Sequence, residues 1–287
     1  MSIRLRFVFA ASAASLLAVA ACGTPDASTE ADVGADATPA TAAYRPSAGH
    51  LPAEIAAAYD AHAADLPAGR AIAYTLDLHF GGRQRFAGRI TQSVAMDRID
   101  VDRAADGMEL RYDGEDVAMI GDTAAGEPWP RARFDVFTWP YFFGAPFKLA
   151  DPGTQWGEVK AYPWRGGEPT DAAKLTFDAG TGDAPDDYYV VVPGADGLVA
   201  GMAYVVTFGK GADAVAEAEP HAIAYSEYRE VDGVPIAHRW DFYNWDPEAG
   251  LGEERIGFAE LSNVVWVEVD DAAFATTDGV AVELPWD

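Results

Sequence analysis

The sequence predicts a mainly β fold: a curved antiparallel sheet that forms an unclosed barrel, with short helices covering its concave side. Three observations predict it. Apolar and polar residues alternate in one segment after another, which is typical of half-buried strands. Gly-Gly and Asp-Gly pairs separate several of these segments and favour tight hairpin turns. An aromatic-rich segment in the middle of the chain carries prolines that exclude a long helix or a central strand.

The first 21 residues are expected to be a secretory signal rather than part of the fold. Arg4 and Arg6 give a positive start, an apolar run follows, and small residues precede Cys22. The ending Val-Ala-Ala-Cys resembles the lipobox of bacterial lipoproteins, which implies cleavage before Cys22 and acylation of that residue. Gly23 then favours, by analogy with this lipoprotein class, the periplasmic side of the outer membrane. Because Cys22 is the only cysteine, no internal disulfide can form.

The remainder is expected to be a tether followed by one domain. Residues 22–49 contain the lipidated cysteine and then a polar stretch without an apolar period, which predicts a disordered tether. Residues 50–287 are expected to form a single half-barrel domain. Its first element is a short helix over 51–64, with Pro52 at its start and Glu54 in its first turn.

Strands follow this helix. Five short strands joined by tight turns predict an antiparallel meander. They are expected at 71–80, 84–94, 98–103, 108–112 and 117–120.

The second half of the chain repeats the pattern, and no long helix interrupts it. The clearest hairpin lies at Asp232-Gly233. A sheet of so many strands must curl or close, so a half-open barrel is the expected architecture. The predicted strands are 156–162, 173–178, 188–192, 198–208, 222–229, 234–245, 254–258 and 261–269.

Residues 134–147 break the alternation with a concentration of aromatic side chains. One or two helical turns are expected around 133–143, followed by an extended exit. So apolar a segment must cover something, and the open mouth of the curved sheet is the candidate. The predicted plug or lid residues are Phe134, Phe137, Trp139, Tyr141, Phe142, Phe143 and Phe147.

Charge and missing motifs exclude several functions. The formal net charge of −26 excludes nucleic-acid binding through phosphate neutralisation and electrostatic adhesion to anionic lipid. The sequence contains no nucleophile-elbow motif, phosphate-binding glycine loop or zinc-protease motif. A cysteine nucleophile is excluded because Cys22 carries lipid. No catalytic residue, metal or cofactor is therefore predicted.

One enzymatic alternative remains open. His79, His221 and His238 lie far apart in sequence, but strands can bring distant residues together. With a nearby carboxylate they would suit an envelope hydrolase or a metal-dependent enzyme. The simpler interpretation is that each is a hydrogen-bonded histidine of the core or an edge.

Several segments resemble bacterial lipoprotein-localisation-like proteins: 108–116, 228–236 with its Val-Asp-Gly-Val-Pro-Ile core, and the closing 269–274. The segment 139–153 is more closely similar to an uncharacterised family of secreted bacterial proteins thought to share that fold. The resemblance implies an unclosed antiparallel barrel, plugged by helices, that holds acyl chains by burial, and it carries over no enzyme site. A soluble carrier lacks a lipid anchor, so Cys22 favours a tethered receptor or lipid-binding protein over a shuttle.

The leading hypothesis is a non-enzymatic lipoprotein that binds a lipid, an acyl chain of a lipoprotein or another apolar small molecule in the half-barrel. Apolar burial would drive this binding. A structural or interaction lipoprotein with a filled core is the other alternative, and the sequence does not indicate an oligomeric state. The predicted cavity-lining residues are Ile72, Tyr74, Leu76, Leu78, Phe86, Ile90, Trp240 and Phe242.

Overall fold

The structure, a computed structural model, describes residues 44–121, 129, 131–208, 210, 215–216 and 218–283. The expected signal peptide over 1–21, the lipidation site Cys22 and most of the expected tether lie outside the described residues. Residues 40–287 form one compact unit. In the described part of the chain, no helix has the length and hydropathy that crossing a membrane requires.

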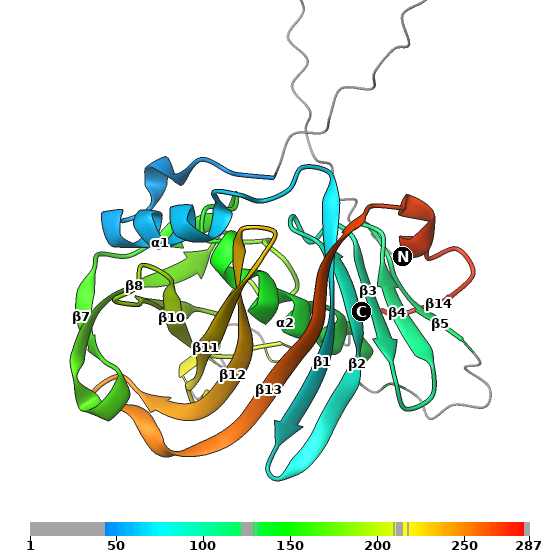
Figure 1. The fold of residues 1–287 in the computed structure, drawn as a ribbon. Helices are drawn as coiled ribbons and strands as arrows, with labels where there is room; N and C mark the ends of the chain where they lie inside the picture. The colour runs from blue at the N-terminus through cyan, green and yellow to red at the C-terminus, as the bar shows by residue number, and fades with distance from the viewer. Residues whose placement is uncertain are drawn as a thin grey trace, which may run out of the picture. The chain divides into compact units, whose positions relative to one another are not determined.

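A large antiparallel sheet dominates the described domain (Figure 1). Its strands are β1 (Arg70–Phe80), β2 (Arg83–Ser93), β3 (Ile99–Arg103), β4 (Met108–Tyr112), β5 (Val117–Ile120), β6 (Thr154–Trp156), β7 (Lys160–Pro163), β8 (Pro169–Phe177), β9 (Tyr189–Pro193), β10 (Val199–Tyr204), β11 (His221–Val231), β12 (Val234–Asp246), β13 (Gly250–Glu268) and β14 (Val280–Ala281). The helices are α1 (Ala53–Ala63) and α2 (Ala132–Gly144), with 3-10 turns η1 (Ala48–His50), η2 (Ala145–Phe147), η3 (Arg165–Gly167) and η5 (Asp271–Phe274).

The strand order is β14-β5-β4-β3-β2-β1-β13-β12-β11-β10-β9-β8-β6, with β7 paired to β8 beside this path. β14 pairs with β5 and β6 with β8, so the two end strands do not meet in the described residues. The sheet curves without closing, because a twisted sheet of this width curls. This confirms the predicted mainly β fold with an unclosed antiparallel barrel.

β13 corrects the strand prediction. The sequence indicated separate strands at 254–258 and 261–269, but one continuous strand spans Gly250–Glu268. Thr75 of β1 pairs with Ser262, but Ala73 pairs with Val265, so β13 has one extra residue at this point. Asn263, inside the irregular stretch, has φ 53°. This bulge moves the buried positions from odd numbers (Leu261) to even numbers (Trp266). The predicted break at 259–260 lies before this bulge, where Ala259 and Glu260 stay paired with both β1 and β12.

The predicted strand over 156–162 is also wrong, because here one predicted strand corresponds to two observed ones. The chain forms two short strands there, β6 and β7, which pair with the two ends of β8. Between them the amide of Gly157 donates to the carbonyl of Lys174, after which the chain leaves the ladder. The sequence also missed β14, extended β10 too far and began β8 too late.

α2 is longer than the expected one or two turns, and its exit is the 3-10 turn η2 instead of an extended segment. Pro140 lies inside the helix, where it removes one N–H donor. The helix continues because it is packed into the main hydrophobic cluster together with the concave face. Figure 1 shows α2 inside the curve of the sheet and α1 along its upper edge, where α1 contacts η2, β9 and β12.

Contacts of the described domain begin at Tyr44, within the range expected for the tether. The hydroxyl of Tyr44 donates to Asp151 at 3.0 Å, and Arg45 pairs with Asp60 at 2.7 Å. Burial raises the pKa of Tyr44, so its phenol stays a donor. Both contacts hold the start of the domain against α1 and the segment that follows α2.

Candidate functional site

The eight residues predicted to line a cavity are all buried, and they share one hydrophobic cluster with α2. Four come from β1, two from β2 and two from β12. Trp240 borders the smaller of the two cavities described below, and the other seven line neither. Their part in ligand binding stays a prediction. They are Ile72, Tyr74, Leu76, Leu78, Phe86, Ile90, Trp240 and Phe242.

The C-terminal half of α2 rests directly on β1 and β2. The ring of Phe143 stacks on Tyr74, with centroids 4.2 Å apart and planes 12° apart. The Tyr74 hydroxyl donates to Gln92 at 2.9 Å, and the Gln92 amide donates to the carbonyl of Pro140 at 3.1 Å. Gln92 is 1% exposed, so this chain of bonds satisfies a buried amide and fixes the helix to the sheet.

α1 contributes a buried histidine, His62, that packs beside the C-terminal end of α2. The Nε2 atom of His62 accepts from the amide of Val199 at 3.0 Å, and the Phe147 ring meets the imidazole edge-on at 5.8 Å. Burial lowers the pKa of His62 to about 4, so the ring is neutral at pH 7. Nearby, the Tyr225 hydroxyl donates to the carbonyl of Phe142 at 2.6 Å.

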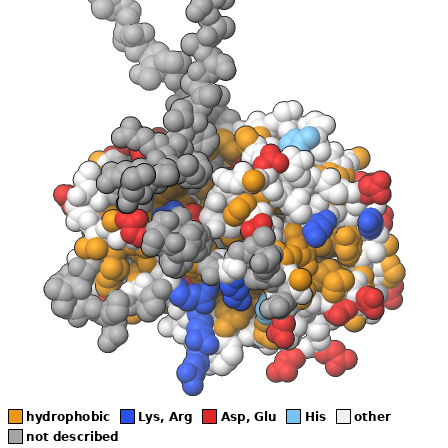
Figure 2. Space-filling view, turned by 180° about the vertical axis from the view of Figure 1, so that it is seen from behind, with side chains coloured by type: hydrophobic (Ala, Val, Ile, Leu, Met, Phe, Trp, Pro, Cys, Tyr) orange, Lys and Arg blue, Asp and Glu red, His pale blue; other side chains and the backbone are white. Residues whose placement is uncertain are grey.

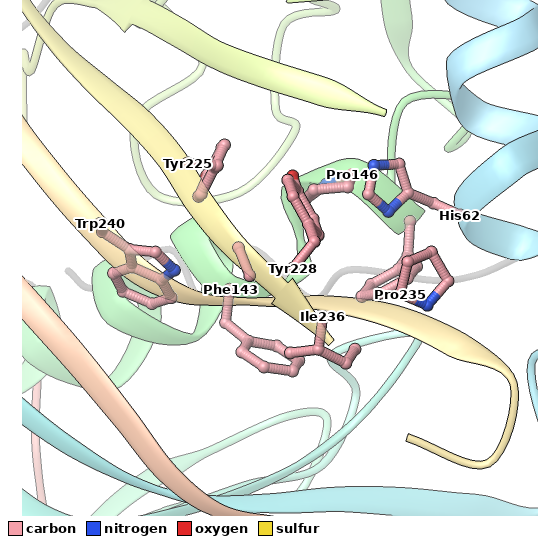
Figure 3. A pocket seen from close by; sticks show the side chains of 10 residues that line it. His62, Phe143, Pro146, Tyr225, Tyr228, Pro235, Ile236 and Trp240 are labelled. Atoms are coloured by element: carbon pink, nitrogen blue, oxygen red, sulfur yellow. The ribbon is translucent and has the colours of Figure 1, made fainter. Parts of the chain in front are cut away.

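Almost no space is left among these side chains. The cavity between them has a volume of about 10 Å³, about that of one water probe. Figure 3 shows the lining side chains converging from α1, the end of α2, and β11 and β12. We call this region the closed end and define it by His62, Phe143, Phe147, Tyr225 and Tyr228.

A second cavity, of about 1210 Å³ and open to solvent, lies at the other end of the strands. β1 reaches it with its last residue, Phe80, and β11 with its first, His221. Ligand pockets typically measure about 300–1,000 Å³, so this space can accommodate a sizeable small molecule. We call it the open end and define it by six of its aromatic residues: Phe80, Trp129, Phe134, Trp139, Phe142 and Tyr204.

The aromatic wall of the open end is held together by ring contacts. Trp139 lies 6.4 Å from Phe80, 5.9 Å from Phe134 and 6.1 Å from Phe142, measured between ring centroids. Tyr204 lies 4.9 Å from Phe142. Tilted and edge-to-face pairs at these distances attract one another, so the wall is ordered without a ligand.

A single carboxylate orients two of the indoles. The two oxygens of Asp135 accept from Trp129 Nε1 at 2.8 Å and from Trp139 Nε1 at 3.0 Å. Burial raises the pKa of Asp135, and the two indole donors and nearby arginines oppose that shift. Asp135 therefore positions one wall of the open end.

Basic residues are concentrated around this cavity. Among the described residues, its lining includes four Lys or Arg side chains and three Asp or Glu side chains, although acids outnumber basic residues in the sequence by 46 to 20. Figure 2 shows Lys and Arg side chains gathered beside hydrophobic ones in the lower part of the face seen from behind. The basic lining residues are Arg85, Arg131, Arg133 and Lys210, and the acidic ones are Asp135, Glu219 and Glu283.

Arg133 has a structural role among these cations. Its guanidinium donates to both oxygens of Asp183, at 2.6 and 3.1 Å, and to the carbonyl of Val282 at 3.2 Å. Both side chains of the pair are 18% exposed. The first turn of α2 is thereby fastened to the loop before β9 and to the segment after β14.

The aromatic segment divides between the two ends. Phe137 packs against Tyr112 at 5.0 Å and Tyr141 against Tyr189 at 5.3 Å, away from either cavity. A role for the segment as a lid stays a prediction. The five other members line a cavity: Phe143 and Phe147 the small one, and Phe134, Trp139 and Phe142 the large one.

The three candidate histidines have different neighbours. His79 stacks on Phe258 at 4.6 Å, His221 lies beside Tyr204 at 6.1 Å, and His238 bonds the carbonyl of its neighbour Ile236 at 3.0 Å. No group of three or more His, Cys, Asp or Glu side chains suited to a metal ion occurs among the described residues.

The charged residues of the open end were not among the predicted site residues. Arg131, Arg133 and Asp135 carried the strongest signal, since they are charged positions at the start of an otherwise apolar segment. Lys210 is one of only four lysines in the chain. Arg85 gave no signal, because it occupies an ordinary polar position in an alternating strand.

No protein-family model matches the sequence, and no curated protein is similar to it. Several solved structures, including the following two, are similar over most of the chain. One is a LolA superfamily protein from Nitrosomonas europaea, with a TM-score of 0.49, 9% identity and coverage of 77% of this chain and 96% of that chain. The other is a DUF1329 family protein from Desulfovibrio piger, with a TM-score of 0.49, 14% identity and coverage of 78% and 96%.

Proposed function

We propose that this protein is a non-enzymatic lipoprotein of the bacterial envelope that binds one lipid, acyl chain or comparable apolar molecule at the open end. The observation that carries the proposal is the cavity of about 1210 Å³ with its aromatic wall. α2 serves as a plug that fills the rest of the half-barrel. The ligand lies beside Phe134, Trp139 and Phe142 of α2, and the strand ends form the other wall.

Apolar burial supplies the binding free energy. Each methylene that leaves water contributes about 0.8 kcal/mol, so a long acyl chain offsets the loss of translational freedom on binding. The wall favours such a guest because Asp135 already occupies the indole N–H groups of Trp129 and Trp139. The rings therefore present their apolar faces and edges to the space.

The proposed location rests on the sequence. The lipobox-like ending at Cys22 supports a lipid anchor, and Gly23 supports the periplasmic side of the outer membrane. An anchored protein receives or holds its ligand near the membrane, so we propose a receptor or lipid-binding role in preference to that of a free shuttle.

Native mass spectrometry of the mature chain tests the proposal. The chain would run over residues 22–287 with Cys22→Ser, so that no acyl chain of its own is attached, and it would be purified without detergent. We expect a bound species at one molecule per chain, which organic extraction identifies as a lipid.

A cavity-filling variant, Val206→Trp, tests the location. Val206 lines the large cavity, and the larger indole side chain would occupy part of that space. We expect this variant to fold and to lose most of the bound species. A wild-type chain that is always empty and binds no added acyl probe would contradict the proposal.

A further inference from the structure

The cations at the open end differ in how they are engaged. Arg133 is held by Asp183, as described above. In the described ranges of the chain, no ion pair or side-chain hydrogen bond involves Arg85, Arg131 or Lys210. Unpaired cations beside an apolar cavity in a chain of net charge −26 need an explanation.

Arg85 reaches the cavity because of a local irregularity in β2. Leu78 of β1 pairs with Phe86, and the next residue, His79, pairs with Gln84, so Arg85 is the extra residue of a bulge. Bulges redirect side chains, and the Arg85 side chain lines the large cavity.

Arg131 stands at the start of α2. Its guanidinium lies 3.8 Å from the centroid of the Phe134 ring, which is part of the cavity wall. Stacking of this kind leaves the N–H donors at the edge of the guanidinium free. The helix has no side-chain N-cap, so its first amides add positive potential at the same place.

None of the lining carboxylates forms an ion pair with these cations in the described part of the chain, although the charge of Arg131 acts on Asp135. Asp135 is engaged by two indoles, and Glu219 and Glu283 are exposed at the mouth without an ion-pair partner in the described part of the chain. The apolar wall therefore lies next to unpaired guanidinium groups. This arrangement matches a ligand with an apolar chain and an anionic head group.

Resting on the proposed function, we infer that the ligand is an acyl chain with a free carboxylate. Its hydrocarbon lies against the aromatic wall, and Arg131 and Arg85, with Lys210, hold its head group at the mouth. The planar fork of an arginine matches a carboxylate with two parallel hydrogen bonds. No covalent step is involved.

The test uses the unlipidated mature chain over residues 22–287 and a neutral fluorescent probe, N-phenyl-1-naphthylamine. Hexadecanoate, hexadecanol and hexadecylamine compete with this probe below their aggregation concentrations. We expect hexadecanoate to displace it at a concentration at least tenfold lower than either chain-matched competitor.

The variant is Arg85→Gln with Arg131→Gln, which removes two charges of exposed side chains and the stacking of Arg131 on Phe134. We expect its affinity for hexadecanoate to fall at least tenfold, and to fall far more than its affinity for hexadecanol. The matched control is Arg89→Gln on the same strand, because Arg89 is exposed at a regular ladder position opposite Thr75 and does not line the cavity. It should bind all three competitors as the wild type does.

Two failures are distinguishable. If the neutral probe does not bind at all, the proposed function is wrong. If the probe and all three competitors bind with equal strength, and the double variant changes none of them, the cavity binds apolar molecules but the inference about the carboxylate is overturned.

Discussion

The closed and open ends of the half-barrel are built from the same materials and differ in what lies opposite the sheet. Both have aromatic walls to which α2 and the strands contribute. At the closed end α1 and the C-terminal half of α2 fill the space, leaving about 10 Å³. At the open end α2 contributes one wall, from Ala132 to Phe142, α1 does not line the space, and about 1210 Å³ remains. Aromatic content therefore does not decide where a cavity forms; the lengths and positions of the covering helices do.

The polar groups differ in the same way. At the closed end they are neutral and point into the protein, as in the bonds from Tyr74 to Gln92 and from Tyr225 to the carbonyl of Phe142. At the open end they include charged groups at the rim. The closed end thus has buried, neutral hydrogen bonds, whereas the open end has charged groups that would face the proposed ligand.

The largest effect should come from removing packing at the closed end. Phe143→Ala deletes a buried ring stacked on Tyr74 and should lower the free energy of unfolding by about 3–5 kcal/mol, measured by urea denaturation. The matched change at the open end, Phe134→Ala, should cost about 1–2 kcal/mol, since one side of that ring faces the cavity. Equal losses would show that the two ends are packed alike.

Acid should weaken the closed end through His62. Between pH 6.5 and about 4 the unfolded chain binds a proton at this residue while the folded protein does not, so stability falls as the pH falls. The shift corresponds to about 3 kcal/mol. His62→Gln keeps an acceptor for the amide of Val199 and should lack this part of the pH dependence. The check is urea unfolding of both proteins at pH 7 and pH 4; identical pH slopes would contradict the assignment.

Asp135→Asn should disturb the open end moderately. Asparagine has one carbonyl oxygen, so one of the two indoles, Trp129 or Trp139, loses its acceptor. We expect a loss of about 1–2 kcal/mol in unfolding free energy, a change in tryptophan emission and several-fold weaker binding of hexadecanol. Unchanged tryptophan emission together with unchanged hexadecanol binding would show that Asp135 does not position the wall of the open end.

The smallest effect belongs to a site outside both ends. Asp100 alternates with the buried residues Ile99 and Val101, and burial raises the pKa of Asp100 to about 7. Since the folded protein keeps this proton longer than the unfolded chain, stability falls as the pH rises from about 4 to 7. Asp100→Asn should therefore stabilise the protein by about 1 kcal/mol at pH 8 and leave ligand affinity unchanged. A gain in stability at pH 4 with none at pH 8 would contradict a raised pKa of Asp100.

The strands of the concave face were predictable because each is buried on one side, which imposes a period of two. β4 and β5 match the predicted ranges, and β1 begins one residue earlier than expected. What period cannot show is a bulge, since an extra residue shifts the phase without changing composition. The bulge at Asn263 lies inside the predicted strand 261–269 and was not anticipated, and the bulge at Arg85 hid a residue of the open end.

The position of the large cavity was only partly predictable from the sequence. The sequence indicated that the aromatic segment covers the concave face, and Phe143 and Trp139 both do so. Which part of the face stays uncovered depends on the length of α2 and on the direction in which it crosses the sheet. Both follow from tertiary contacts such as those of Gln92 and Arg133, which leave no trace in local sequence pattern.

A crystal structure with 16-bromohexadecanoic acid tests the central claim most directly, because the anomalous signal of bromine locates the chain end. The account predicts one bromine peak per chain inside the open end, beside Trp139 or Phe142, with the carboxylate near Arg131 and Arg85. A peak at the closed end beside His62, or a large cavity that holds only water at saturating ligand, would contradict it.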